Sequence, residues 1–231
     1  MSETALPDRA QPRRILRLLA VAIASAVLTV LALLAYPHLL GAWRYVPELD
    51  RLFASLHQDQ MLIDALRQQN TALADKDQAW ALAQDRIWNA ERYDPAPGTL
   101  QRAVMLTPAS QHLREIVEAS QGLIGHAFLI DAKGRIAAAP YPSYNFWQFD
   151  KPKFHYTFPL GAGARDVSWL QFSWDRRHPV CWRAETMVDP QSGAPIGVLA
   201  LEVNYLKVGY FGCREAPVHS EYERKTNHVA E

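Results

Sequence analysis

The sequence has no excess of charge of either sign. Its 231 residues include 24 lysines and arginines and 24 aspartates and glutamates, so the formal net charge is zero. With no long basic stripe, this balance gives no reason to expect nucleic acid as a partner. A hydrophobic content of 49% is instead typical of one folded domain with an appendage.

Enzyme motifs are also missing. The sequence contains no Gly-x-Ser-x-Gly, Walker A, Gly-x-Gly-x-x-Gly or His-Glu-x-x-His motif. His126, His155, His178 and Cys181 lack the short spacing of a structural zinc site. We therefore predict that the chain is not an enzyme and has no catalytic residue, no metal and no cofactor.

Cysteine is scarce, since Cys181 and Cys213 are the only two in the chain. A disulfide between them would contribute roughly 3 to 4 kcal/mol in the chain-entropy estimate and would indicate an oxidising compartment. A pair of buried free thiols is the competing interpretation, because spacing alone does not show that the two Cα atoms approach each other.

One long stretch lacks charge altogether: Leu18 to Tyr36 are nineteen residues without a charged side chain. As a helix this stretch spans roughly 28 Å, close to the roughly 30 Å of a hydrocarbon core, so we predict a transmembrane helix at residues 18–40. Arginines before it and aromatic residues after it predict a single-pass protein whose residues 1–17 stay in the cytoplasm. These flanking residues are Arg9, Arg13, Arg14, Arg17, Trp43 and Tyr45.

A cleaved signal peptide is the alternative, and Arg13-Arg14 fits a twin-arginine signal. We favour the membrane helix, because the apolar run is longer than a usual signal core and no clear small-x-small cleavage site follows it. The Ala24-Ser25-Ala26 triplet lies within the run, where cleavage would leave half of the apolar segment behind.

A membrane-proximal helical region is predicted at residues 44–92. Apolar residues recur every seven positions from Leu49 onward for about forty residues. Two partners for this stripe stay open: a second copy in a parallel dimer, which Asn70 at a seam position favours, or the sheet of the same chain. Polar residues near Asp75 predict a break between two helices, with Asp75 as the N-cap.

Beyond the proline-rich breaker that begins at residue 93, a short helix is expected from Thr107-Pro108, and from Gly125 onward the apolar period approaches two. Helices followed by short antiparallel strands indicate an α+β fold with one five-stranded sheet. The expected strands are 126–130, 135–139, 166–174, 180–188 and 197–204. We assign residues 93–205 to this domain and 206–231 to a C-terminal tail.

The segment Ser143–Phe158 concentrates seven aromatic residues, two lysines, a histidine and a carboxylate in sixteen positions. It follows an apolar run that ends in a turn at Asp131–Gly134, so we expect it to lie across the sheet. Apolar walls with a few polar groups are what a small-ligand pocket needs. An aromatic core whose polar atoms are satisfied internally is the alternative.

Three blocks resemble the PDC (PAS-like Cache) sensor family: Ala127–Gly134, Asn145–Phe154 and Gly193–Leu199. The resemblance extends over roughly residues 60–205. It implies an extracytoplasmic ligand-sensing domain of a bacterial receptor, on the periplasmic side of the inner membrane. Its expected architecture is a PAS-like five-stranded antiparallel sheet flanked by helices and preceded by the long membrane-proximal helix.

The middle block departs from the family pattern at three positions. Asn145, Phe149 and Lys151 stand where the family has aspartate, glycine and an acidic residue. A larger side chain fills space and a reversed charge changes which ligand is attracted. The departures therefore predict a ligand different from the usual one, or none.

The predicted pocket has aromatic walls and a few charged anchors. Asp150 falls on the family's aspartate and would accept hydrogen bonds from an amine or hydroxyl, whereas an arginine would bind a carboxylate in a bidentate way. An ion pair with a nearby lysine is the alternative for Asp150. The candidate walls are Tyr144, Phe146, Trp147, Trp169 and Trp174, and the other candidate anchors are Arg176 and Arg183.

Two functions follow. The first is a membrane-anchored periplasmic module that binds an amino acid, amine or carboxylate and, lacking an output domain of its own after Asn204, acts through a protein partner or as a homodimer. The second is an interaction protein of the cell envelope that uses a degenerate sensor fold as a docking surface. Ligand screening and pull-down from membranes distinguish them.

Overall fold

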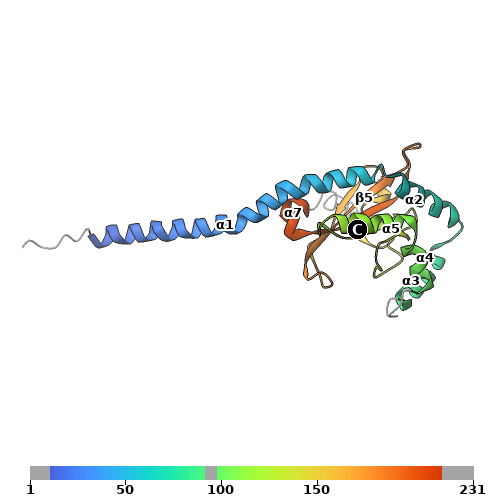
Figure 1. Ribbon diagram of the computed structural model, residues 1–231, viewed down its shortest axis with the longest axis horizontal. Coiled ribbons are helices and arrows are strands. Elements are labelled where there is room, and N and C mark those ends of the chain that lie inside the picture. The colour runs from blue at the N-terminus through green and yellow to red at the C-terminus, as the bar shows by residue number, and fades with distance from the viewer. Residues whose placement is uncertain (1–10, 92–97, 215–231) are drawn as a thin grey trace, which may run out of the picture. The chain divides into compact units, whose positions relative to one another are not determined.

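The computed structural model describes residues 11–91 and 98–214, except for the side chains of residues 11–15 and 33–40. Two compact units, Met1–Leu40 and Gly41–Glu231, make up the chain. Helix α1 (Gln11–Leu56) begins in the first unit and continues into the second (Figure 1).

In the first unit, every described side chain of α1, from residue 16 to residue 32, is exposed. Among the residues described, no helix combines the length and the apolar content that a membrane crossing requires. The expected transmembrane segment, residues 18–40, lies partly outside the described side chains. The expected cytoplasmic segment, residues 1–17, lies largely outside them, as does most of the expected tail.

The second unit contains one antiparallel sheet in the order β2-β1-β6-β5-β3, and β4 pairs with β5 beside β3. The α+β class and the antiparallel sheet are confirmed. The expectation of five strands was wrong, because six are described. The strands are β1 (Ile124–Asp131), β2 (Ile136–Ala138), β3 (Arg165–Val167), β4 (Gln171–Ser173), β5 (His178–Val188) and β6 (Pro195–Asn204).

The sixth strand arises because the expected strand 166–174 is interrupted. Ser168 donates its backbone N–H to Trp182 O at 2.8 Å, and its hydroxyl oxygen accepts from Trp182 N at 2.9 Å. A side chain thus replaces a backbone carbonyl in the ladder. Pairing resumes at Gln171 with its register against β5 shifted by one residue, as in a β-bulge.

Helices cover both faces of the sheet (Figure 1). The second-unit part of α1 packs with α2 and α5 on one face, where Phe53, Leu66 and Leu113 are buried. Trp88, Val104 and Phe154 from α3, α4 and α6 pack on the other. The remaining helices are α2 (Gln60–Ala72), α3 (Gln78–Glu91), α4 (Thr99–Met105), α5 (Pro108–Ala119), α6 (Pro152–His155), α7 (Tyr205–Gly212) and the 3-10 turn η1 (Phe158–Leu160).

Helix starts are set by side-chain caps. Thr107 accepts from Ser110 N and begins α5, as expected. Asp59 accepts from Met61 N and Leu62 N and begins α2, so the predicted continuous stripe breaks there as well. The break before α3 was expected with Asp75 as its cap. The cap is instead Asp77, which accepts from Trp80 N at 2.9 Å.

The apolar stripe of the helical region packs on the sheet of the same chain. Asn70 fixes this docking: its side-chain amide donates to Ile196 O at 2.7 Å and accepts from Ala132 N at 3.0 Å. Leu62, Ile63 and Leu66 are buried in the same core cluster as the sheet residues. The polar seam residue that favoured a dimer thus holds α2 against its own domain.

The aromatic segment Ser143–Phe158 covers the second face of the sheet rather than extending a strand across it. Its one ladder contact is the bridge from Trp147 to Arg135, after which α6 and η1 follow. Phe146 and Phe154 are 2% and 1% exposed. The segment is therefore in part the aromatic core that was the alternative interpretation.

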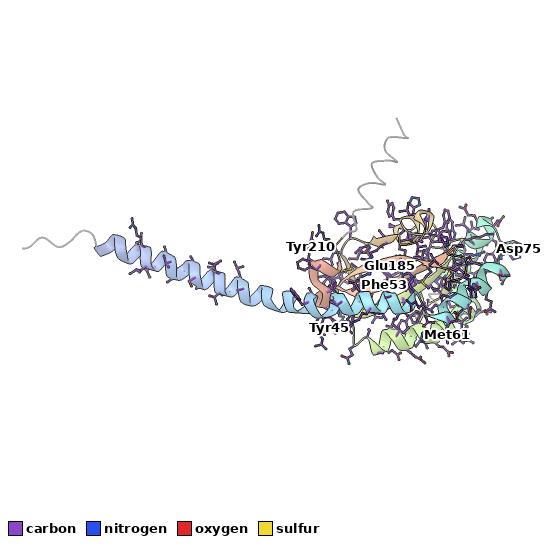
Figure 2. The ribbon with its side chains drawn as sticks, turned by 90° about the horizontal axis from the view of Figure 1, so that it is seen from above. Tyr45, Phe53, Met61, Asp75, Glu185 and Tyr210 are labelled. Atoms are coloured by element: carbon purple, nitrogen blue, oxygen red, sulfur yellow. A yellow bond between two sulfur atoms is a disulfide. The ribbon has the colours of Figure 1, made fainter. Side chains whose placement is uncertain are left out.

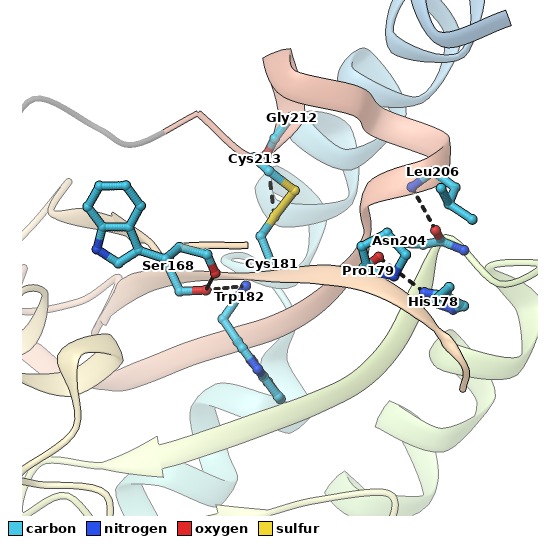
Figure 3. Close-up of a disulfide and its surroundings, with 10 residues drawn as sticks. Ser168, His178, Pro179, Cys181, Trp182, Asn204, Leu206, Gly212 and Cys213 are labelled. Carbon is cyan, nitrogen blue, oxygen red and sulfur yellow. Dashed lines mark hydrogen bonds between the residues drawn. A yellow bond between two sulfur atoms is a disulfide. The ribbon is translucent and has the colours of Figure 1, made fainter. Parts of the chain in front are cut away.

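The predicted disulfide between Cys181 and Cys213 is present, with the two Cα atoms 5.7 Å apart. It ties α7 to β5 (Figure 3). Asn204 caps α7 by accepting from Leu206 N at 2.9 Å. Residues 205–212, which lie almost wholly within the range expected to be tail, are therefore folded onto the domain.

Candidate functional site

A cleft opens on the second face of the sheet, between the strands and the loop that follows β2. We call it the sheet cleft. It consists of a cavity of about 500 Å³ and a neighbouring one of about 250 Å³. The residues that line both are His126, Pro142, Ser143, Tyr144, Ser173, Asp175 and Glu202.

The floor of the sheet cleft is a row of side chains from three adjacent strands. His126 of β1 lies opposite Glu202 of β6, and Glu202 lies opposite Trp182 of β5. Because alternate residues of a strand share a face, Phe128 joins the row, with its ring stacked 4.9 Å from that of Trp182. The floor thus combines an imidazole, a carboxylate and two aromatic rings.

Two cations stand beside this floor. Lys153 of α6 places its Nζ 4.0 Å from the Trp182 ring centroid and 4.9 Å from that of Phe128. Arg176, in the turn after β4, has its Nε 3.4 Å from Glu202 Oε1. The cleft therefore offers groups of both charge signs against aromatic walls.

Burial shifts the pKa values of three side chains in the sheet cleft. It lowers the pKa of His126 to about 4, and Arg176 and Lys153 act in the same direction. Burial also lowers the pKa of Lys153 to about 8, which Glu202 opposes, and it raises the pKa of Glu202 against the effect of Arg176. Near neutral pH the imidazole is uncharged and Lys153 is mostly protonated.

Two polar atoms of the floor lack hydrogen bonds. Within the described part of the chain, His126 Nε2 and Glu202 Oε1 are buried without a hydrogen bond, although Arg176 Nε lies 3.4 Å from Glu202 Oε1 as an ion-pair partner. Most buried polar groups in proteins are paired, and an unpaired one costs about 1 to 3 kcal/mol. A polar ligand that hydrogen-bonds to these two atoms would recover part of this cost.

Sequence reasoning placed only part of this site. Three residues that were predicted as walls or anchors of a pocket line the sheet cleft: Tyr144, Trp174 and Arg176. Phe146 is instead buried in the core, and Trp147 stacks on Phe149 beside a separate cavity of about 240 Å³.

The other predicted residues lie elsewhere. Trp169 is 74% exposed and lines none of the cavities described here. Asp150 is exposed and does not line the sheet cleft, although Lys151, its ion-pair partner at 3.0 Å, does. Arg183 follows Trp182 directly and therefore points to the opposite face of the sheet.

Arg183 belongs to a charge cluster between β5 and α1. Its guanidinium lies 2.6 Å from both Asp50 and Glu185 and 4.3 Å from the Phe53 ring centroid. Figure 2 labels Phe53 and Glu185. His57 Nε2 lies 2.9 Å from the other oxygen of Glu185. Arg183 thus holds α1 against the sheet instead of binding a ligand in the sheet cleft.

Acidification is expected to weaken this cluster. Although burial opposes ionisation of Glu185, the hydrogen bond with His57 and the charges of Arg183 and Arg165 hold its pKa at about 2, below the usual 4.5. A lowered folded-state pKa contributes stability that is complete above about pH 4.5 and is lost as the pH falls toward 2.

The wild-type chain should therefore lose about 2 to 3 kcal/mol more than Glu185→Gln over this pH range. Urea unfolding of both chains at several pH values measures the difference. Parallel pH profiles of the two chains would contradict the role given to Glu185.

Three polar residues of the sheet cleft, two in its floor and one beside it, were missed as a ligand site. His126 was considered only as a metal ligand, Lys153 only as an ion-pair partner of Asp150, and Glu202 not at all. Among the described residues, no three His, Cys, Asp or Glu side chains come together as a metal site would need. The available signal was the period-two pattern, which puts His126 and Phe128 on one face.

No family model matches the sequence, and no curated protein matches it. Solved structures do. The extracellular domain of vpHK1S-Z8, assigned as a histidine kinase, has a TM-score of 0.49 and 14% identity, covering 86% of this chain and 64% of that one. The sensor domain of the V. cholerae histidine kinase DctB has a TM-score of 0.35 and 16% identity, covering 71% and 61%.

The ligand-binding domain of the Campylobacter jejuni chemoreceptor Tlp3, in complex with 4-methylisoleucine, has a TM-score of 0.35 and 12% identity, covering 71% of this chain and 65% of that one. This chain thus spans less than two-thirds of the length of each of these three structures.

Proposed function

We propose that this chain is a membrane-anchored, sensor-like module that binds a small ligand in the sheet cleft and acts through a protein partner. The observation that carries the proposal is the buried row of polar atoms in the sheet cleft, where His126 Nε2 has no hydrogen-bond partner and Glu202 Oε1 has only the 3.4 Å ion pair with Arg176 Nε. A ligand that hydrogen-bonds to them recovers free energy that the unliganded fold lacks.

The charges of the sheet cleft define the ligand class. Lys153 and Arg176 attract a carboxylate, and Glu202 attracts an amine. Trp182 and Phe128 supply apolar area for the rest of the molecule. A ligand with both charges, as in an amino acid, fits this arrangement best, followed by simple carboxylates and amines.

The anchor rests on the apolar segment at residues 18–40. Its described side chains, residues 16–32, are exposed around the whole helix and most of them are apolar, a composition that suits lipid rather than water. The arginines before it support a cytoplasmic N-terminus, and the disulfide fits a periplasmic location for the domain. We propose a single-pass protein of a bacterial inner membrane.

One observation favours the second function, an envelope docking protein. Exposed apolar side chains gather on β4 and the residues beside it, at one edge of the sheet. Edge strands leave backbone groups free to pair with another chain. The side chains are Trp169, Leu170, Phe172 and Trp174, which are 50% to 80% exposed.

Ligand binding is tested by thermal unfolding of the full chain in detergent, with amino acids, carboxylates and amines added singly. A ligand at one hundred times its Kd stabilises the fold by about 2.7 kcal/mol. We expect Lys153→Met to lose this shift, since it removes the charge and keeps the apolar stem. Lys76→Met is the matched control, because Lys76 pairs with Asp75 away from the sheet cleft and should keep the full shift.

Two outcomes oppose the proposal. If no compound stabilises the chain while a protein is retained with it on pull-down from membranes, the docking function replaces the sensor function. If Asp150→Ala abolishes the shift and Lys153→Met does not, the ligand binds at the aromatic segment near Asp150 rather than in the sheet cleft.

A further inference from the structure

Helix α7 exposes apolar side chains on the surface of the domain. Leu206, Tyr210 and Phe211 are 52%, 62% and 61% exposed. Trp43, near the start of the second-unit part of α1, is 82% exposed. We call these four residues the α7 patch.

The α7 patch is held rigidly at the level of residues 41–45. A Cβ on Gly41 would come within 2.6 Å of Lys207 O, so this close approach needs a glycine. Lys207 Nζ lies 4.9 Å from the ring centroid of Tyr45, and Figure 2 shows Tyr45 and Tyr210 at the same end of the domain. The disulfide and the Asn204 cap fix the two ends of α7 (Figure 3).

The length of the proposed anchor sets the depth of these residues. Residues 18–40 span roughly 35 Å as a helix, against a hydrocarbon core of about 30 Å with about 5 to 7 Å of headgroups on each side. Gly41 follows the anchor directly and so lies close to the headgroup layer, and α7 is near that layer because Lys207 O closely approaches Gly41.

We infer that the α7 patch binds the lipid surface of the bilayer in which the chain is anchored. Aromatic side chains with an apolar body and a polar tip, such as Trp43 and Tyr210, favour this layer. Exposed Arg44 follows Trp43 directly and exposed Arg214 lies three residues after Phe211, and both suit anionic headgroups. The inference rests on the proposed anchor and adds a second contact of the chain with the membrane.

Photolabelling tests it on the full chain in vesicles that contain anionic lipid and a diazirine-bearing lipid. After irradiation, mass spectrometry locates the lipid adducts. We expect adducts in residues 18–40 and also in 205–212, the latter several-fold above peptides of α4. Leu106 beside α4 is the matched control, because it is 59% exposed but belongs to a different part of the fold.

A double variant, Leu206→Asp with Phe211→Asp, should lower the labelling of α7 several-fold and leave the unfolding temperature unchanged, since both residues are exposed. If residues 18–40 are labelled but the α7 peptide carries no more label than the Leu106 peptide, the inference is overturned and the anchor is supported. Undiminished labelling of α7 in the double variant would overturn the inference in the same way. Without adducts in 18–40, the anchor itself would fail.

Discussion

Replacing Asp131 by alanine is expected to destabilise the fold by about 3 to 5 kcal/mol, the usual cost of removing one partner of a buried ion pair. Asp131 and Arg135 are 0% and 1% exposed, and their side chains are 2.6 Å apart. The carboxylate also accepts from Lys133 N, Arg135 N and the Gln69 amide. Alanine leaves these donors and a buried guanidinium without their partner.

Urea unfolding of the full chain in detergent measures this change. Asp150→Ala is the control, because Asp150 is exposed and its ion pair with Lys151 contributes less than about 1 kcal/mol. Replacing both partners, Asp131→Leu with Arg135→Met, should cost less than Asp131→Ala alone, since no uncompensated charge remains. A loss below about 1 kcal/mol in Asp131→Ala would show that the pair does not hold the turn together.

Removing the disulfide has the second large effect. Cys213→Ser breaks the bridge while leaving buried Cys181 in place, and the 32-residue separation predicts a loss of about 3 to 4 kcal/mol. For a domain of this size the unfolding temperature should fall by roughly 6 to 16 °C. Differential scanning calorimetry measures both quantities.

A reducing agent should lower the unfolding temperature of the wild-type chain to that of Cys213→Ser and leave the variant unchanged. Equal unfolding temperatures for the oxidised wild-type chain and Cys213→Ser would contradict a stabilising role of the bridge. A variant that unfolds earlier but still responds to the reducing agent would show that the reagent acts elsewhere.

Local chemistry made much of the fold predictable. Asp131–Gly134 carries the residues of a tight turn, and Gly134 has a positive φ of 77° that such turns require. Thr107 followed by proline is a helix start whose geometry depends on neighbouring residues alone. These features need no knowledge of distant parts of the chain.

The site was harder to predict, because its floor depends on strand register. His126 and Glu202 are opposite each other only through the pairing of β1 with β6. Both faces of β5 are largely buried, so its composition does not reveal that Trp182 and Arg183 point to opposite faces. Arg183 was therefore predicted as a ligand anchor, although it contacts α1.

The two faces of strand β5 carry side chains with different chemical roles. Trp182 forms part of the cleft floor, while the next residue, Arg183, contacts Asp50 of α1, and Glu185 contacts His57 just beyond the helix. Trp182 in the floor of the proposed ligand site and Arg183, whose ion pair holds α1, are thus adjacent residues of one strand. Strand β5 therefore connects the floor of the sheet cleft directly to helix α1.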